Sequence, residues 1–173
     1  MTSVRGAWCV VSSVWALSLG VAQPGSAQED EVGIAVGARP PTVTIADLDG
    51  NAVDLSTVIG KKPVLLEFWA TWCPRCAALL PRMEAARTRF GDQVEFVAIA
   101  VAVGQTPASV KRHLTRHPIP LRLLWDSDGN AVRAFQAPGT SFVVVLGRDG
   151  KVAYTGYGED QDIEGAVARV TGR

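Results

Sequence analysis

A run of apolar residues that does not alternate with polar ones constrains this fold more than any other feature of the chain. Residues 63–70 have the sequence PVLLEFWA, and a second such run covers residues 94–103. A strand with one face in water alternates apolar and polar side chains, whereas continuous runs are typical of strands buried on both faces of a sheet. Such a sheet needs helices on its faces. The sequence therefore predicts an α/β architecture.

Helical patterns follow these runs. Thr106 and Pro107 form an N-cap and first-turn pair for one helix, which we expect to end near His117. A last helix is predicted from about Asp160 to Val170. The helix after the first run has apolar side chains with the 3.6-residue spacing of one helix face: Leu79, Met83, Ala86 and Phe90.

Two turn sequences predict β-hairpins. The first hairpin spans residues 42–55 and turns at Asp49-Gly50-Asn51, and the second spans residues 142–155 and turns at Arg148-Asp149-Gly150. A short strand is also expected at residues 121–125. Hairpins pair strands antiparallel, whereas strands joined through helices pair in parallel. The sequence thus predicts one domain with a mixed central sheet flanked by helices, and 173 residues suffice for one ordinary core.

The N-terminal residues 1–27 have the pattern of an export signal. Arg5 precedes a mostly apolar stretch, residues 6–22, and Gly25-Ser26-Ala27 supplies the small residues that a signal peptidase recognises. We expect cleavage after Ala27; an uncleaved membrane anchor is the alternative, because the stretch falls just short of a spanning length. Either outcome places the protein outside the cytoplasm, in the periplasm or cell envelope. Residues 28–41 are predicted to be a linker, and residues 42–173 the folded domain.

The charge balance excludes one class of partner. Lys plus Arg and Asp plus Glu both number 17, so no excess of positive charge is present to hold a nucleic-acid backbone. The chain has three cysteines, and Cys9 lies within the predicted export signal. Only Cys73 and Cys76 therefore belong to the predicted domain.

The sequence Cys73-Pro74-Arg75-Cys76 stands where the first buried strand gives way to a helix. A helix N-terminus presents unpaired N–H groups and the positive end of the helix dipole, which favour a thiolate at Cys73. Pro74 suits the first helical position, and Arg75 adds a nearby cation. Lowering the thiol pKa from about 8.5 to about 7 would raise the thiolate fraction at pH 7 from about 3% to about half. Cys76, one turn further in, can close a disulfide with Cys73. Cys73 is then the attacking thiol and Cys76 the resolving one.

This cysteine pair has two other interpretations. A structural disulfide across two residues closes a very small loop, which removes little entropy from the unfolded chain. A zinc site would need His113 and His117, which lie at i and i+4 of one predicted helix, as further ligands. The 36-residue gap between Cys76 and His113 is far from the spacing of zinc fingers. Solvated or capping histidines are the simpler interpretation.

The segment from Leu66 to Cys76, LEFWATWCPRC, resembles the FWATWC-x-x-C block of the TlpA/ResA-like branch of the thioredoxin superfamily, whose members are exported thiol–disulfide reductases. The resemblance covers roughly residues 37–170. Pro81 matches a proline in the active-site helix of thioredoxins, and residues 47–62 resemble the N-terminal extension of the branch. The resemblance implies a thioredoxin-like fold with an N-terminal β-hairpin extension. It also implies a redox-active Cys73–Cys76 disulfide, with no metal and no cofactor.

Glu67 stands six residues before Cys73, at a position where thioredoxins carry a buried acid. Desolvation within an apolar strand would raise the pKa of this carboxyl and suit it to exchange protons with Cys76. In the alternative, the side chain reaches an edge of the sheet or a solvent channel and affects only stability. Trp69 and Trp72 are expected to pack around the site rather than to take part in chemistry.

A late loop departs from the pattern of the family, which places a cis-proline directly before a Thr-rich strand facing the cysteines. Here residues 136–142 are QAPGTSF. Aligning Phe142 with the strand of the family puts Gly139 at the proline position, whereas using Pro138 requires one extra residue. We predict a cis peptide bond before Pro138, because a cis bond before glycine would cost ~2.5–4 kcal/mol. Pro138 and Thr140 are accordingly assigned to the active-site loop, together with Trp72.

Three functions fit this pattern. The first is an enzyme that reduces disulfides of exported proteins, including a role in cytochrome c maturation, with electrons from an upstream membrane thiol donor. The second is a disulfide oxidase; such oxidases carry a large helical insertion for which the chain has no room. The third is a non-catalytic adaptor or metal chaperone. Copper chaperones of this fold carry a histidine in the late loop, and no histidine follows His117.

Overall fold

The structure of the protein is a computed structural model that describes residue 2 and residues 32–172. The predicted export signal, including Cys9, lies outside the described residues except for Thr2. No helix among the described residues has both the length and the apolar character needed to cross a membrane.

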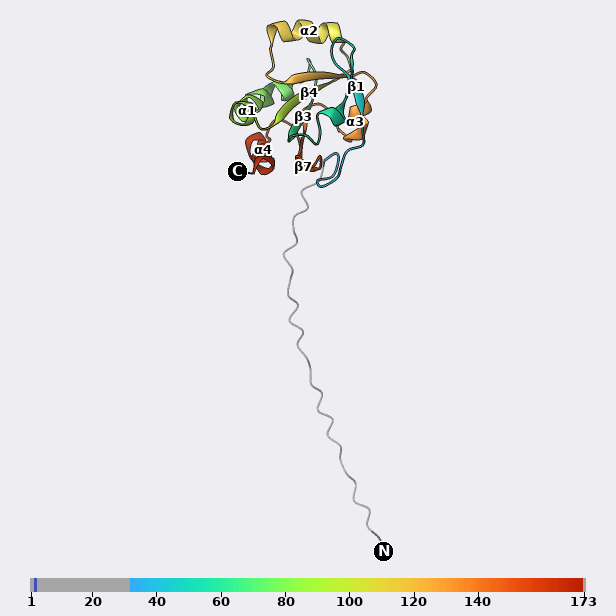
Figure 1. Cartoon of the computed structure of the whole chain (residues 1–173), viewed down its shortest axis with the longest axis vertical. Helices are drawn as coiled ribbons and strands as arrows, with labels where there is room; N and C mark the ends of the chain where they lie inside the picture. Colours follow the sequence, from blue (N-terminus) through green and yellow to red (C-terminus); the bar gives the residue numbers. More distant parts are fainter. Residues whose placement is uncertain (1, 3–31, 173) are drawn as a thin grey trace.

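A mixed sheet forms the centre of the described domain (Figure 1). Its strands lie in the order β2-β1-β5-β4-β3-β6-β7. The central strands β3, β4 and β5 are mutually parallel, and every other neighbouring pair is antiparallel. The predicted mixed sheet and both predicted hairpins are thereby confirmed. The strands are β1 (Thr44–Ala46), β2 (Ala52–Asp54), β3 (Val64–Trp69), β4 (Glu95–Val101), β5 (Arg122–Asp126), β6 (Phe142–Leu146) and β7 (Val152–Tyr157).

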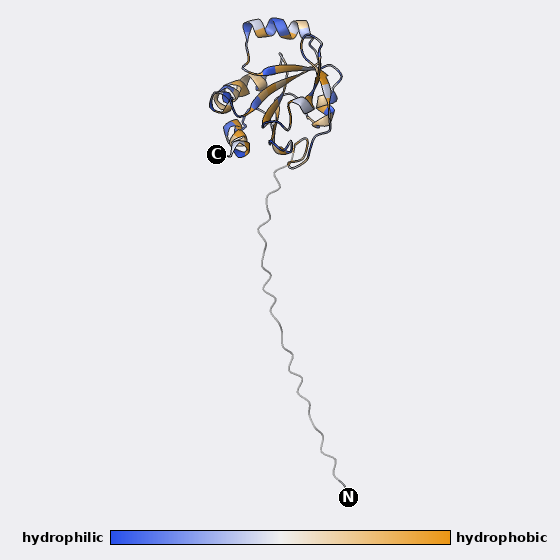
Figure 2. Ribbon diagram, viewed as in Figure 1, coloured by the Kyte–Doolittle hydropathy of each residue, from blue (hydrophilic) through white to orange (hydrophobic). Residues whose placement is uncertain are grey.

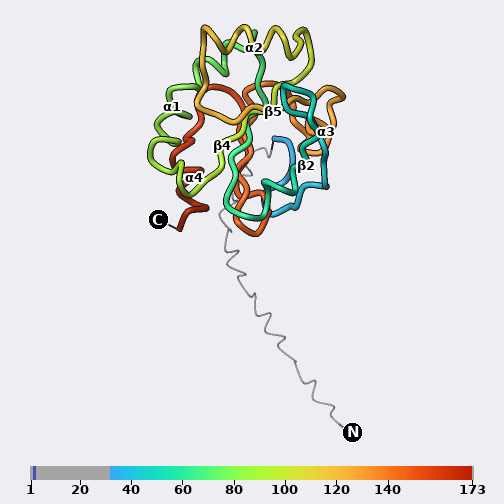
Figure 3. Tube along the Cα trace, turned by 45° about the horizontal axis from the view of Figure 1, so that its top comes forward, coloured from blue at the N-terminus to red at the C-terminus, as the bar shows by residue number. Residues whose placement is uncertain are grey.

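Helices cover both faces of this sheet. Figure 3 shows α1 and α4 side by side on one flank, with α3 on the opposite flank and α2 across one end of the sheet. Figure 2 shows the strands as the most apolar part of the domain and α2 as largely hydrophilic. The helices are α1 (Pro74–Phe90), α2 (Pro107–Arg116), α3 (Asn130–Ala134) and α4 (Ile163–Thr171), with a short 3-10 turn η1 (Leu55–Thr57).

Two hydrophobic clusters follow from the alternation of side chains along β3. Leu65 belongs to the cluster covered by α1 and α4, whereas Leu66 and Phe68 belong to the cluster that includes residues of α2 and α3. All six residues of β3 are buried, as the non-alternating apolar run predicts. The predicted inward face of α1 is also confirmed, since its four members are all buried. Glu67 is the one acid within this buried strand.

The helix α3 was not predicted from the sequence. It has five residues and no side-chain cap at Gly129, so it carries neither a periodic apolar pattern nor a capping signal. Instead, the buried carboxylate of Asp126, at the end of β5, accepts hydrogen bonds from the backbone N–H groups of Ala131 and Val132 at 3.2 and 2.9 Å. This helix thus depends on a side chain from the preceding strand.

The described part of the predicted linker, residues 32–41, packs against the domain. Ile34 is 4% exposed, and its N–H donates to the carbonyl of Phe135 at 3.0 Å. The N–H of Gly37 donates to the carbonyl of Val152 at 2.7 Å. Residues 28–41 are predicted to be a linker, but two glycines with positive φ, Gly33 and Gly37, let the described part turn back onto the sheet.

We predict that Gly33→Ala destabilises the domain much more than Gly37→Ala. Both glycines have φ near +85°, but a methyl group at Gly33 would overlap the ring of buried Phe142, whereas nothing lies within 4 Å of a methyl group at Gly37. Backbone strain alone should cost Gly37→Ala about 1 kcal/mol, and strain plus overpacking should cost Gly33→Ala roughly 2–4 kcal/mol. Urea unfolding of both variants measures this. Equal losses would show that residues 33–38 do not dock on the domain.

Candidate active site

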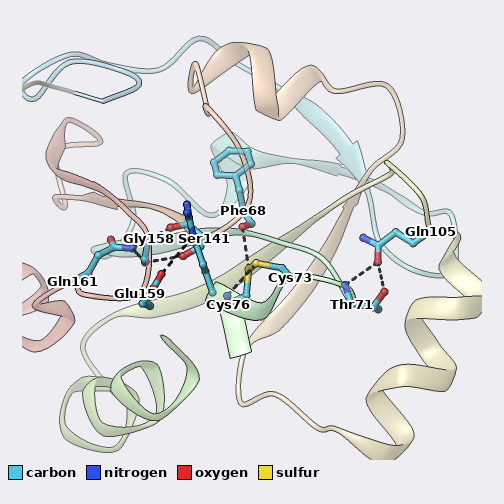
Figure 4. Close-up of a disulfide and its surroundings, with 10 residues drawn as sticks. Phe68, Thr71, Cys73, Cys76, Gln105, Ser141, Gly158, Glu159 and Gln161 are labelled. Atoms are coloured by element: carbon cyan, nitrogen blue, oxygen red, sulfur yellow. Dashed lines mark hydrogen bonds and ion pairs between the residues drawn. A yellow bond between two sulfur atoms is a disulfide. The ribbon is translucent and has the colours of Figure 1, made fainter. Parts of the chain in front are cut away.

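The two cysteines lie where β3 ends and α1 begins. Trp69 is the last residue of β3, and Pro74 is the first residue of α1. Cys73 and Cys76 form a disulfide with their Cα atoms 5.3 Å apart (Figure 4). Both cysteines are buried, with Cys73 6% exposed and Cys76 2% exposed. The small exposed part of the pair therefore belongs mainly to Cys73.

Cys73 is the N-cap of α1. Its backbone is extended, with φ −88° and ψ 102°, and its sulfur accepts a hydrogen bond from the N–H of Cys76 at 3.0 Å. Pro74 occupies the first turn, where its missing N–H leaves no hydrogen bond unmade. An N–H donor and the positive end of the helix dipole both stabilise negative charge at this sulfur. This geometry suits a thiolate at Cys73.

The turn before the cysteines is held by partners from the chain that follows β4. The side-chain oxygen of Gln105 accepts from the N–H and the hydroxyl of Thr71 at 3.0 and 2.9 Å. The indole N–H of Trp72 donates to the carbonyl of Val103 at 2.8 Å, while the side chain remains 49% exposed. Gln105 was not identified from the sequence, because no local pattern marks a glutamine that bonds a residue 34 positions away.

The guanidinium of Arg75 contacts two side chains from the C-terminal part of the domain. It lies 3.6 Å from the carboxylate of Glu159 and 5.5 Å from the ring centre of Tyr157. The positive charge of Arg75 is thus opposed by a carboxylate. The effect of Arg75 on the Cys73 thiol stays a prediction, now with Glu159 as a partner of the guanidinium.

Glu67 is 2% exposed, and its Oε1 atom has no hydrogen-bond partner. Burial raises the pKa of this carboxyl to about 8. The side chain lines a cavity of about 270 Å³ that is also lined by Cys73 and Cys76. The predicted desolvated acid is therefore present next to the cysteine pair. At neutral pH it is mainly protonated.

His113 and His117 line the same cavity. His117 is exposed and is the C-cap residue of α2, as the solvated or capping interpretation predicts, whereas His113 is half-buried. Their ring centres are 4.8 Å apart, and His113 meets the ring of Trp69 edge-on at 5.7 Å. Burial, followed by the charges of His117 and Arg116, lowers the pKa of His113. Among the described residues, no group of three or more His, Cys, Asp or Glu side chains is arranged to hold a metal ion.

The predicted cis peptide bond before Pro138 is wrong. None of the peptide bonds in the described residues is cis. The loop instead turns at Gln136 and Ser141, two non-glycine residues with φ of 51° and 67°. Pro138 is exposed and Thr140 is half-buried, and neither lines the cavity beside the cysteines.

Ser141, rather than Pro138, joins this loop to the site. Its N–H donates to the carbonyl of Phe68 at 2.7 Å, and the sulfur of Cys76 lies 4.0 Å from that same carbonyl (Figure 4). The buried amide of Gln161 donates to the carbonyls of Ser141 and Gly158 at 3.0 and 2.6 Å. The hydroxyl of Ser141 also donates to the carbonyl of Gly158 at 2.7 Å. These bonds stabilise the uncommon backbone conformation of Ser141.

The family model described as Redoxin matches residues 35–170. The chain belongs to the Redoxin family. Together with the fold and the cysteine pair, this match identifies the redoxin as a TlpA/ResA-like protein of the thioredoxin superfamily and as a thiol–disulfide oxidoreductase. The family resemblance and the thioredoxin-like fold predicted from the sequence are both confirmed.

Relatives of this redoxin carry matching names. It is 24% identical over 145 residues to the thiol-disulfide oxidoreductase ResA of Bacillus cereus, with 82% of each chain covered. It is 29% identical over 138 residues to the ResA of Geobacillus kaustophilus, with 78% of each chain covered. Its fold is similar to the thioredoxin domain of a thiol-disulfide oxidoreductase from Bacteroides vulgatus. That structural match has a TM-score of 0.68 and 20% identity, and it covers 80% of this chain and 99% of the other.

We predict that Glu67 makes the stability of the redoxin fall as pH rises from about 5 to 8. The folded protein keeps the proton of Glu67 up to its raised pKa of about 8, whereas the unfolded chain releases it near pH 4.5. Unfolding then releases a proton between these values, so stability decreases with rising pH by roughly 1.4 kcal/mol per unit. Glu67→Gln, which cannot ionise, should lack this slope.

Urea unfolding of the oxidised wild type and of oxidised Glu67→Gln, from pH 4 to pH 9, measures the difference. The gap between the two curves should widen across the window from about pH 5 to pH 8 and be constant above it. Parallel curves over the whole range would show that Glu67 is in contact with solvent and ionises normally.

Proposed function

We propose that this protein is an exported protein-disulfide reductase in which Cys73 attacks and Cys76 resolves. The observation that most supports this proposal is the position of Cys73 at the start of α1, where the N–H of Cys76 donates to its sulfur. The thiolate of Cys73 attacks one sulfur of a client disulfide, and the other client sulfur leaves as a thiolate that takes up a proton. Cys76 then attacks Cys73 in the mixed disulfide and releases the second client thiol. Two electrons and two protons pass from the dithiol to the client.

The charge around Cys73 supports the reducing direction. In strongly oxidising dithiols the thiolate is highly stabilised. This stabilises the reduced form, so the pair readily accepts electrons. Here the nearest cationic side chain in the sequence, Arg75, is paired with Glu159, and Glu67 is mainly protonated at neutral pH. The helix N-terminus then stabilises the thiolate of Cys73, and neither Arg75 nor Glu67 adds an unpaired charge. This arrangement favours a reducing pair.

Glu67 is assigned the exchange of a proton with Cys76. Both side chains line the same cavity, and the unpartnered Oε1 atom of Glu67 leaves one acceptor free. The ionised form of Glu67 takes the proton of Cys76 before the resolving attack. The protonated form returns it when the pair is reduced again. A pKa near 8 makes both forms accessible close to neutral pH.

The export pattern of residues 1–27 supports a reaction in the periplasm or cell envelope, with the chain either released or N-terminally anchored. There the clients are exported proteins with disulfides, including apocytochromes c. An upstream membrane dithiol returns the pair to its reduced form by the same exchange in reverse. Trp72, Pro74, Arg75, Pro138 and Thr140 are assigned to the surface that meets the client.

We predict that Cys76→Ser, expressed with its own N-terminal segment, accumulates covalent complexes with exported proteins. A mixed disulfide through Cys73 then has no second thiol within the domain to resolve it. Acid-quenched extracts, separated without reductant, should show adducts that vanish on reduction. Mass spectrometry of these adducts identifies the clients.

The matched control is the double variant Cys73→Ser/Cys76→Ser, which keeps every other thiol of the chain and should form no adduct. Adducts at the same level in the double variant would exclude Cys73 as the attacking group. Absence of adducts from Cys76→Ser would favour a non-catalytic adaptor. Apocytochromes c among the trapped proteins would support the maturation role, whereas a varied set would indicate a general reductase.

A further inference from the structure

The helix α2 forms one wall of the cavity beside the cysteine pair. His113, on α2, and His117, the residue that ends the helix, line the cavity together with Cys73 and Cys76. Of the ten described residues of α2, only Val110 is buried. Figure 2 shows α2 as a hydrophilic helix at one end of the domain. The outer surface of this helix is therefore exposed next to the reactive disulfide.

The charge on α2 has one sign. The sequence contains no Asp or Glu from residue 96 to residue 125, while α2 carries Lys111, Arg112 and Arg116. Lys111 pairs with Asp49 at 2.5 Å. Arg112 and Arg116 are exposed, and neither forms an ion pair with any described residue. These two arginines, here called the α2 arginine pair, are thus cations without an acidic partner on the helix whose His113 lines the cavity.

The acids on the other side of the site are already paired. Glu159 lies 3.6 Å from Arg75, and Asp160 lies 3.3 Å from Arg82. Both arginines belong to α1. The unbalanced charge around the cysteine pair is therefore positive, although the whole chain has a formal net charge of zero. A charge concentrated in this way acts on the approach of a partner rather than on fold stability.

We propose that the α2 arginine pair docks an acidic segment of the client protein, next to the client disulfide that Cys73 attacks. The proposal rests on the proposed reductase function and adds the chemistry of the substrate that it prefers. Arg112 and Arg116 are four residues apart, which separates them by about 6 Å along the helix. Carboxylates two residues apart on one side of an extended peptide are about 6.6 Å apart. An extended client segment with acids at i and i+2 matches this spacing.

Such docking raises the rate of encounter more than the affinity of the complex. Charge complementarity increases association rates by roughly 10–10³-fold and weakens as salt screens it. The disulfide exchange itself needs only the client sulfur at Cys73. The docking surface therefore selects among disulfides of similar reactivity according to the charge of the flanking residues.

The test uses the reduced full chain and three cyclic peptides that share one disulfide and one length. They differ only at two positions, two residues apart, which are both Glu, both Gln or both Lys. Acid quenching and thiol labelling give the second-order rate constant for oxidation of the protein by each peptide. At about 20 mM salt the wild type should react about tenfold faster with the Glu peptide than with the Lys peptide, and less than twofold faster at about 0.5 M salt.

Charge reversal in Arg112→Glu/Arg116→Glu should invert the order of the peptides. The matched control is Arg148→Glu/Lys151→Glu, which changes the charge by the same four units at two exposed residues of the turn between β6 and β7. Leu146, at the end of β6, pairs with Val64 at the start of β3, so this turn lies at the opposite end of the sheet from Cys73. The control should keep the wild-type order. Circular dichroism of each variant checks that it is folded.

The outcomes separate this proposal from the function on which it rests. Equal rates for the three peptides with the wild type, or an unchanged order in the double variant, would overturn docking on α2 and leave the reductase function in place. Inversion by Arg148→Glu/Lys151→Glu as well would show that total charge decides, which also overturns docking on α2. Oxidation by none of the peptides would overturn the reductase function itself.

Discussion

The hydrogen bond from the N–H of Cys76 to the sulfur of Cys73, at 3.0 Å, is the interaction on which the site depends. It exists only because β3 ends and α1 begins within a few residues, so that Cys73 becomes the N-cap of the helix. The buried strand fixes the position of this junction, and the pairing of β3 with both β4 and β6 fixes the strand. The core of the domain therefore fixes the position of the Cys73 sulfur at the N-terminus of α1.

The same strand also contains a residue that destabilises the fold. Glu67 lies in the middle of β3 with a raised pKa and an unpartnered oxygen, which makes it a costly residue for an apolar strand. The cavity of about 270 Å³ shared by Glu67, His113 and the cysteines connects this acid to the reactive pair. Stability is thus given up at the place where proton transfer would be needed, as is common at active sites.

Local patterns could be predicted from the sequence, and long-range contacts could not. The buried strands, both hairpins and the capping of α2 by Thr106 each follow from adjacent residues and are present in the structure. The loop at Pro138 was predicted wrongly, because its path depends on Gln161, which bonds the carbonyl of Ser141 from 20 positions away. The partnership of Gln105 with the turn before Cys73 likewise has no local signal. Family resemblance identified the chemistry but not the surface that meets a client.

The reduction potential of the Cys73–Cys76 pair tests the central claim most directly, because exported dithiols on one fold span about −270 to −120 mV. Equilibration of the full chain with glutathione or dithiothreitol buffers, followed by quantification of free thiols, gives this value. With Arg75 paired and Glu67 mainly protonated, we expect a potential below about −200 mV, towards the reducing end of that span. A potential close to −120 mV would contradict the reductase function and identify the protein as an oxidant of its clients.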